Sequence, residues 1–216
     1  MRVLSLMAAT VALAASGAPA DRDHAQWRGT SSEIQGKVRD KIVGSSWREG
    51  CPVAVSKLRL LRVRRWGFDG EVHNGRLVVH RGHDRELLHV FRRLFRKRFP
   101  IRRMKLIDAY GADDHRSMNA DNTSAFNCRV VAGTSRWSMH AYGTAIDLNP
   151  VENPYVTGSG HVSPPAGAPY ANRSRDAKGM VHRGDLVVRA FRRIGWKWGG
   201  NWDWPRDYQH FSANGQ

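Results

Sequence analysis

His140, Asp147 and His210 are the residues of this 216-residue chain whose types and spacing best suit metal chemistry. His140 and Asp147 lie seven residues apart, with glycine and alanine between them, and small residues let a backbone turn tightly and approach a bound group. An imidazole and a carboxylate are ordinary zinc ligands, and a catalytic zinc site needs three protein ligands and an open position for water. A third ligand is expected from a distant segment, where His210 is the candidate.

Asp207 is the candidate general base, because it lies three residues before His210 and is close enough to serve the same site. We expect it to stay off the metal, to take a proton from water and to pass that proton to the leaving amine. Each residue alone has an ordinary alternative. His140 is one of 10 histidines, Asp147 suits a turn at a strand end, and Asp207 suits an ion pair with one of many arginines. Spacing alone therefore leaves the zinc site open.

The elements that must position these residues predict an α+β fold. Apolar residues recur at helical spacing in residues 83–98, and a second helix is expected from a cap at Asp185 to a stop at Gly195. Strands are expected at 58–63, 76–79, 104–107 and 145–148, with Asn74-Gly75 as a hairpin turn. Residues 149–182 are rich in Pro, Gly, Asn and Ser and predict a long functional loop. Short strands mixed with helices, without a regular βαβ rhythm, favour α+β.

The amino-terminal residues predict an exported protein. A basic Arg2, an apolar run and Ala18-Pro19-Ala20 indicate a signal peptide over 1–20. A polar linker is expected over 21–45 and the folded domain over 46–216. The apolar run is too short for a membrane span, which needs roughly 20 residues. We expect a secreted, cell-wall-associated protein with no stable membrane span.

Cys51 and Cys128 suit that compartment, since a cysteine pair outside the cell most often forms a disulfide. Two free buried thiols or half of a metal site are the alternatives. The close Cys or His spacing of a zinc knuckle is absent, which disfavours the metal reading.

The net charge of +16, from 35 Lys and Arg against 19 Asp and Glu, favours polyanionic partners. An arginine-rich solvated surface explains the same composition. For an exported protein an anionic cell wall is the better partner, and we expect no nucleic acid partner and a monomer.

Three strings together resemble a known family: S-x-H-x-x-G-x-A-x-D at 138–147, W-x-W-G-G-x-W at 196–202 and D-Y-x-H-F at 207–211. They are similar to the zinc D-Ala-D-Ala carboxypeptidases, a group with VanY-like carboxypeptidases and L-alanyl-D-glutamate endopeptidases. The resemblance covers roughly residues 46–216 and implies one hedgehog/DD-peptidase-like domain, with a small antiparallel sheet and flanking helices. It also implies Zn²⁺ and cleavage of peptidoglycan stem or cross-link peptides, by either type of activity. The alternative is a non-catalytic, zinc-binding, wall-binding module, as in the hedgehog branch.

The family pattern assigns roles residue by residue. The metal ligands match His140, Asp147 and His210, and the base matches Asp207. Arg129 matches an arginine that holds the scissile carbonyl or stabilises the oxyanion, with a surface salt bridge as its alternative.

Other positions beside the metal keep two readings each. Ser138 contacts substrate or bonds to local backbone. Trp202, with Trp198 and Trp204, lines the cleft or packs in the core. Met139 stands where relatives often carry a polar or acidic residue, which bears on substrate preference only. The resemblance places Cys128 beside Arg129, so a Cys51–Cys128 bridge would brace the loop of that arginine.

Overall fold

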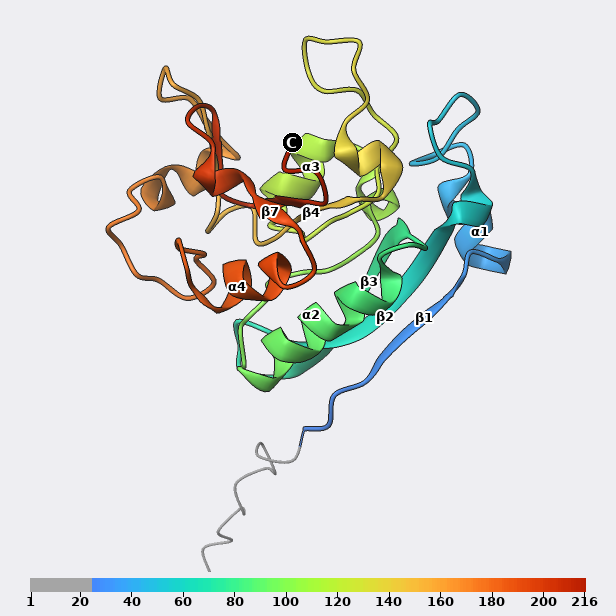
Figure 1. Cartoon of the computed structure of the whole chain (residues 1–216), viewed down its shortest axis with the longest axis horizontal. Helices are drawn as coiled ribbons and strands as arrows, with labels where there is room; N and C mark the ends of the chain where they lie inside the picture. The colour runs from blue at the N-terminus through green and yellow to red at the C-terminus, as the bar shows by residue number, and fades with distance from the viewer. Residues whose placement is uncertain (1–24) are drawn as a thin grey trace, which may run out of the picture.

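The computed structural model describes residues 25–216, so the expected signal peptide lies outside the described residues. Its longest sheet joins β1 (Gly29–Glu33), β2 (Leu58–Trp66) and β3 (Val72–His80) in that order, all antiparallel. Alternate residues of β2 and β3 are apolar and bury one face of this sheet under α2 (Asp84–Arg96). In Figure 1, α2 lies along this sheet and separates it from α4 (Leu186–Arg192).

Both predicted long helices are confirmed, with local causes. The buried residues of α2 are Leu87, Val90, Phe91, Leu94 and Phe95, while acidic residues stand in its first turn and arginines in its last. Helix α4 begins after Asp185, whose Oδ1 accepts hydrogen bonds from the backbone N–H groups of Val187 and Val188. These two helices hold the long sheet against the carboxyl-terminal half.

Two smaller antiparallel sheets carry the expected site residues. One has the order β4 (Ala145–Asp147), β9 (His210–Ser212), β7 (Lys197–Trp198). The other has the order β6 (Val162–Ser163), β5 (Tyr155–Val156), β8 (Arg206–Asp207). The remaining elements are α1 (Gly36–Ile42), α3 (Asp114–Asn119), η2 (Val55–Lys57), η3 (Ile107–Tyr110), η4 (Met139–Tyr142), η5 (Pro165–Tyr170) and η6 (Gly199–Asn201). The α+β class is confirmed.

The structure corrects the expected linker over residues 21–45. Within that range β1 pairs along the whole of its length with β2, and α1 follows it. Ile34 and Ile42 are buried in a second core cluster with Leu58 and Leu60. Strand β1 lies at the edge of the sheet and is held by backbone hydrogen bonds, so its side chains can be polar. Its sequence therefore lacks the apolar periodicity that would have predicted a strand.

The expected hairpin turn at Asn74-Gly75 is wrong, since both residues lie inside β3. The chain turns instead at residues 67–71, where the Gly67 N–H donates to the Glu71 carbonyl and Gly70 has φ 79°. Gly75 is needed for packing, because a Cβ there would lie 2.4 Å from the sulfur of Met104. The strand expected at 104–107 is also absent, although Met104 is buried and its carbonyl accepts from the Arg76 N–H.

Cys51 and Cys128 form a disulfide that joins positions 77 residues apart, as predicted. Both cysteines contact the second core cluster. Across residues 25–216, none of the helices combines the length and the apolar character that a membrane crossing requires.

Candidate metal centre

Three separate segments bring His140, Asp147 and His210 together. His140 lies in η4, Asp147 ends β4 and His210 begins β9, and the antiparallel register sets Asp147 directly opposite His210. Gly143 ends η4 with φ 70°, and a Cβ there would lie 2.7 Å from the backbone nitrogen of His80. The glycine of the 138–147 string is therefore required by both its conformation and its packing.

The three side chains converge on one point. His140 Nε2 lies 3.1 Å from Asp147 Oδ2, and His210 Nδ1 lies 3.0 Å from Asp147 Oδ1. The two imidazole nitrogens are 3.3 Å apart, and all three residues are buried. One ligand atom from each lies within 4.8 Å of the others. A single small cation would reach all three.

The hydrogen bonds of the two outer ring nitrogens, His140 Nδ1 and His210 Nε2, determine which ring atoms carry protons. His140 Nδ1 lies 2.5 Å from the carbonyl oxygen of Ala125, and His210 Nε2 lies 3.0 Å from the oxygen of Gln216. Because a carbonyl oxygen can only accept, each of these nitrogens carries the proton and donates it. The inner nitrogens of neutral imidazoles are then acceptors aimed at a carboxylate, an arrangement that requires a cation. The donor set of two imidazoles and one carboxylate fits Zn²⁺.

The charges of the cluster point the same way. Burial acts to raise the pKa of Asp147, but the neighbouring His140 and His210 hold that pKa well below its ordinary value. Burial acts to lower the pKa of His210, but the hydrogen bond and the charge of Asp147 raise that pKa to about 9. The site thus favours a positive charge between its ligands, which a proton or a metal ion can supply.

Asp207 lies beside the cluster without joining it. Its Oδ1 atom is shielded from solvent and has no hydrogen-bond partner among residues 25–216. Burial, and then the charge of Asp147, raise the pKa of Asp207 to about 7, against the pull of His210 and His140. A carboxyl group with that pKa and an open acceptor suits proton transfer near neutral pH.

Gly199, in the W-x-W-G-G-x-W string, lets Asp207 and His210 pack closely together. A Cβ on Gly199 would lie 2.6 Å from the Asp207 backbone oxygen and 3.3 Å from the His210 Cβ. Any larger residue at position 199 would push the base and the ligand apart.

A cavity of about 770 Å³ opens onto these groups. It is lined by all the sequence-predicted site residues, which are Arg129, Ser138, His140, Asp147, Trp202, Asp207 and His210. Asp114, Tyr155 and His161 also line it, although the sequence interpretation had named none of them. Tyr155 is the register partner of Asp207 across β5 and β8.

Arg129 and Ser138 already have partners at the cavity wall. The Nη2 atom of Arg129 lies 2.7 Å from Asp114 Oδ2, so the ion pair foreseen as its alternative reading is present. Ser138 Oγ accepts a hydrogen bond from the His140 N–H, which caps η4. Arg129 therefore links its loop to α3 and Ser138 caps η4, and both side chains also line the cavity.

The three tryptophans expected in the cleft wall or the core, Trp198, Trp202 and Trp204, have different places. Trp202 lines the cavity with its ring 5.6 Å from that of His210, and its Nε1 donates to the Gly215 carbonyl. Trp198 is buried against Phe211. Trp204 is 60% exposed, so it belongs neither to the core nor to the cavity wall.

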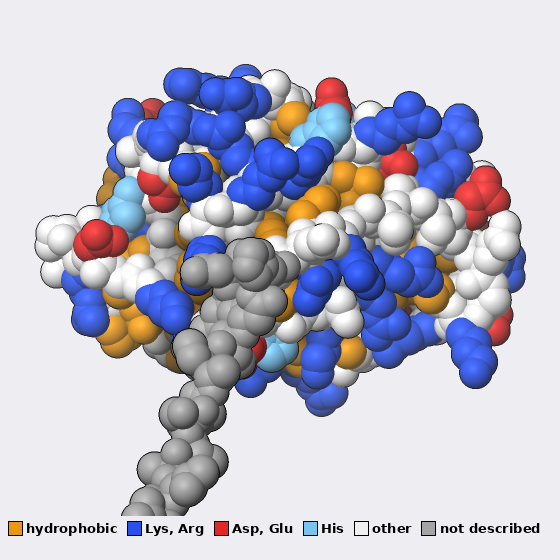
Figure 2. All heavy atoms as spheres, turned by 90° about the horizontal axis from the view of Figure 1, so that it is seen from below, with side chains coloured by type: hydrophobic (Ala, Val, Ile, Leu, Met, Phe, Trp, Pro, Cys, Tyr) orange, Lys and Arg blue, Asp and Glu red, His pale blue; other side chains and the backbone are white. Residues whose placement is uncertain are grey.

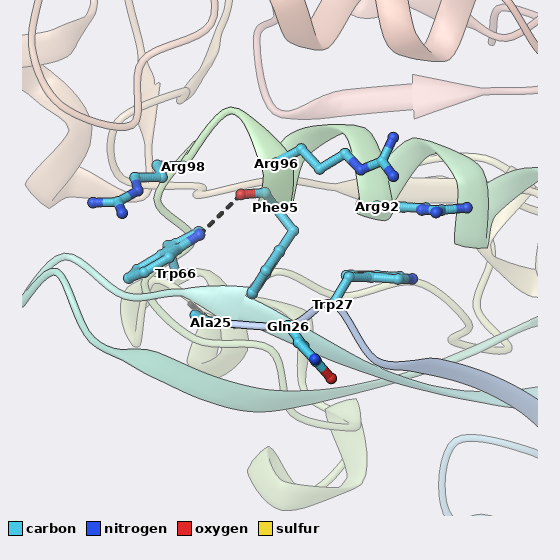
Figure 3. A pocket seen from close by; sticks show the side chains of 8 residues that line it. All are labelled: Ala25, Gln26, Trp27, Trp66, Arg92, Phe95, Arg96 and Arg98. Atoms are coloured by element: carbon cyan, nitrogen blue, oxygen red, sulfur yellow. Dashed lines mark hydrogen bonds between the residues drawn. The ribbon is translucent and has the colours of Figure 1, made fainter. Parts of the chain in front are cut away.

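A second cavity, of about 430 Å³, lies between the carboxyl-terminal half of α2 and the strands. Figure 3 shows Arg92 and Arg96 on one side of it, with Trp27 below and the indole N–H of Trp66 donating to the Phe95 carbonyl. Its lining residues contain no carboxylate, histidine or thiol. The chemistry therefore belongs to the first cavity.

Comparison with known proteins agrees with this site. Residues 132–213 match the sequence model of a family described as D-alanyl-D-alanine carboxypeptidase. No curated protein and no solved structure matches the chain. The matched segment contains His140, Asp147, Asp207 and His210, whereas Arg129 and both cysteines lie before it. Residues 132–213 are thus similar to that family, and the resemblance predicted from the three strings is confirmed over this segment.

Proposed function

We propose that this chain is a zinc peptidase that hydrolyses a peptide bond in peptidoglycan stem or cross-link peptides. The observation that carries the proposal is the convergence of three acceptor atoms on one point, beside the half-buried Asp207, whose Oδ1 is shielded from solvent and has no partner among residues 25–216. The substrate class follows from the family that residues 132–213 match.

The residues divide the work by chemistry. His140 Nε2, Asp147 and His210 Nδ1 would hold the zinc, which when bound supplies Lewis acidity to the carbonyl and lowers the pKa of water. Asp207 accepts the proton of the attacking water and returns it to the departing amine. Arg129 faces the developing oxyanion, with Asp114 fixing the direction of its guanidinium. Trp202 covers the His210 side of the cavity.

Asp207→Asn is the decisive variant. We expect kcat on defined muropeptides to fall by about 10²- to 10⁴-fold, because the amide cannot take a proton. Bound zinc should stay, because Asp207 is not a ligand, whereas His140→Ala should lose it. Asp203→Asn is the matched control, since Asp203 is an exposed carboxylate of the same segment. Zinc content and mass spectrometry of the products are the two readouts.

The products also separate the two activities. Release of D-alanine identifies a carboxypeptidase, and release of a stem peptide identifies an endopeptidase. If the Asp207→Asn variant hydrolysed muropeptides as fast as the unaltered protein, Asp207 would be excluded as the general base. Stoichiometric zinc with no hydrolysis of any muropeptide by the unaltered protein would instead favour the non-catalytic module.

We also propose that the protein works outside the cytoplasm, against an anionic wall. The disulfide and the net charge of +16 support this, as does the amino-terminal sequence. Fusion of residues 1–24 to a reporter that is active only after export tests it, and a reporter that stays inactive would exclude the proposal.

A further inference from the structure

The outer face of the long sheet carries a row of basic side chains. Leu61 and Val63 of β2 pack in the same core cluster as α2, so Arg62 and Arg64 point to the opposite face. Arg76 of β3 is the register partner of Arg62 and points the same way. Two neighbouring strands thus place arginines directly opposite each other.

A third segment extends this row beyond β3. The Arg76 N–H donates to the Met104 carbonyl at 2.9 Å, which sets residues 103–105 alongside the strand. Met104 is buried in the cluster under α2, whereas Arg103 and Lys105 on either side of it are exposed, and the guanidinium of Arg103 donates to the Ala120 carbonyl. We call these five residues, Arg62, Arg64, Arg76, Arg103 and Lys105, the basic sheet face. All except the half-buried Arg64 are exposed.

Their charges are not compensated within residues 25–216. None of the five basic groups lies at ion-pair distance from a carboxylate there. Their observed partners are neutral: Arg62 donates to Ser32 Oγ and Arg64 donates to the Gln26 carbonyl, both at 2.9 Å. Figure 2, from below the view of Figure 1, shows how Lys and Arg outnumber Asp and Glu on that side of the molecule.

Repulsion among the like charges of the basic sheet face destabilises the sheet unless an anion is bound there. Like charges on directly opposed strand positions destabilise a sheet, and here Arg62 opposes Arg76. Neighbouring strands lie about 4.8 Å apart and alternate residues about 6.8 Å apart, so the guanidinium groups form a closely spaced grid. A ligand with regularly repeated negative charges would satisfy several of them at once.

We propose that the basic sheet face binds a linear anionic polymer of the cell wall with one negative charge per repeat unit. The neighbouring outward positions hold Thr30, Ser32 and Asn74, so there is no row of exposed rings for stacking bases of a single-stranded nucleic acid. The described large apolar residues that are exposed are Val130 and Trp204, neither on this sheet, so an apolar wedge for a bilayer is lacking.

The assignment of the basic sheet face as a binding surface rests on strand register and charge, while the choice of a wall polymer as its ligand rests on the proposed function. None of its five residues lines the cavity at the metal cluster. Polymer binding and peptide hydrolysis are therefore separable by mutation. The face would hold the enzyme on its insoluble substrate and leave hydrolysis of a small soluble muropeptide unchanged.

The test compares two triple variants of the full chain with equal loss of charge. One is Arg62→Gln, Arg64→Gln and Arg76→Gln, and the control is Arg183→Gln, Arg192→Gln and Arg193→Gln near α4, where all three arginines are exposed. The probes are poly(glycerol phosphate), polygalacturonate, oligo-dT and anionic phospholipid vesicles, each titrated at several salt concentrations. Polygalacturonate and poly(glycerol phosphate) separate carboxylate from phosphate polymers.

We expect the sheet-face triple to bind poly(glycerol phosphate) roughly tenfold more weakly with a shallower salt dependence, and the control to change by less than about twofold. Equal losses in both triples would overturn the proposal, because net charge alone would then explain binding. Tighter binding of oligo-dT or of vesicles than of either wall-type polymer would overturn it as well. Unchanged thermal unfolding and unchanged cleavage of a soluble muropeptide identify a binding defect, and a protein without any hydrolytic activity leaves this binding result intact.

Discussion

Loss of the Cys51–Cys128 disulfide should remove much of the stability of the fold. The bond closes a loop of 77 residues, and the chain-entropy relation for a loop of that length gives about 4.5 kcal/mol. Replacing both cysteines with alanine also removes a sulfur from the buried Cys128 position. Because domains are stable by only about 5–15 kcal/mol, the double variant should be close to its folding limit. Urea unfolding followed by tryptophan fluorescence measures the difference.

The reductant supplies the internal control. A reducing agent should destabilise the unaltered protein by a similar amount and leave the double-alanine variant unchanged. Arg129 directly follows Cys128, whose N–H donates to the Ser46 carbonyl, so hydrolysis should weaken before global unfolding. A stability loss below about 1 kcal/mol would refute the reasoning, since the loop constraint would then have little effect on the unfolded chain.

Three further predictions concern the site and the core around it. Chelation should lower the melting temperature and added zinc should restore it, because a ligand at a thousandfold excess over its Kd stabilises by about 4 kcal/mol; an unchanged calorimetric scan would contradict a bound metal. Gly199→Ala should lose roughly 1–3 kcal/mol and much activity, because its Cβ would strike the Asp207 backbone oxygen, whereas Gly158→Ala, whose Cβ meets nothing closer than 3.7 Å, should be neutral in urea unfolding. Burial and then Asp121 raise the pKa of Glu152 to about 7, so the contribution of this residue to the free energy of unfolding is full below pH 4.5 and is lost as the pH rises through 7. Glu152→Gln should abolish this pH dependence, and parallel curves of stability against pH for both proteins would exclude the prediction.

Local signals explain which elements the sequence predicted. Helix α2 follows from apolar residues at helical spacing, and α4 from a cap at Asp185. Helical contacts lie three or four residues apart, so a short window of sequence contains them. Strand β1 has no such signal, because its contacts are with β2, some thirty residues later, through backbone groups that every residue shares. Gly75 misled the interpretation for a related reason, since its contact with Met104 is not local.

The site divides in the same way. His140, Asp147, His210 and Asp207 lie in strings dense enough to suggest a shared role, and the fold brings them to one cavity. Asp114 and Tyr155 were missed because their relation to the site depends on tertiary register. Tyr155 meets Asp207 through strands of only two residues, which are too short for any period to be visible.

A cation bound between His140, Asp147 and His210 would also stabilise the fold. Asp147 and His210 are register partners in β4 and β9, and the Ser124 N–H and the Asp147 carbonyl extend that pairing. A buried carboxylate between two imidazole acceptors opposes this pairing unless a cation lies between them. The hydrogen bond and the charge of Asp147 raise the pKa of His210 to about 9, so a proton on this imidazole would supply the cation near neutral pH. Metal binding must then displace this proton, so affinity should weaken as the pH falls, and the same ion that activates water would hold the two strands together.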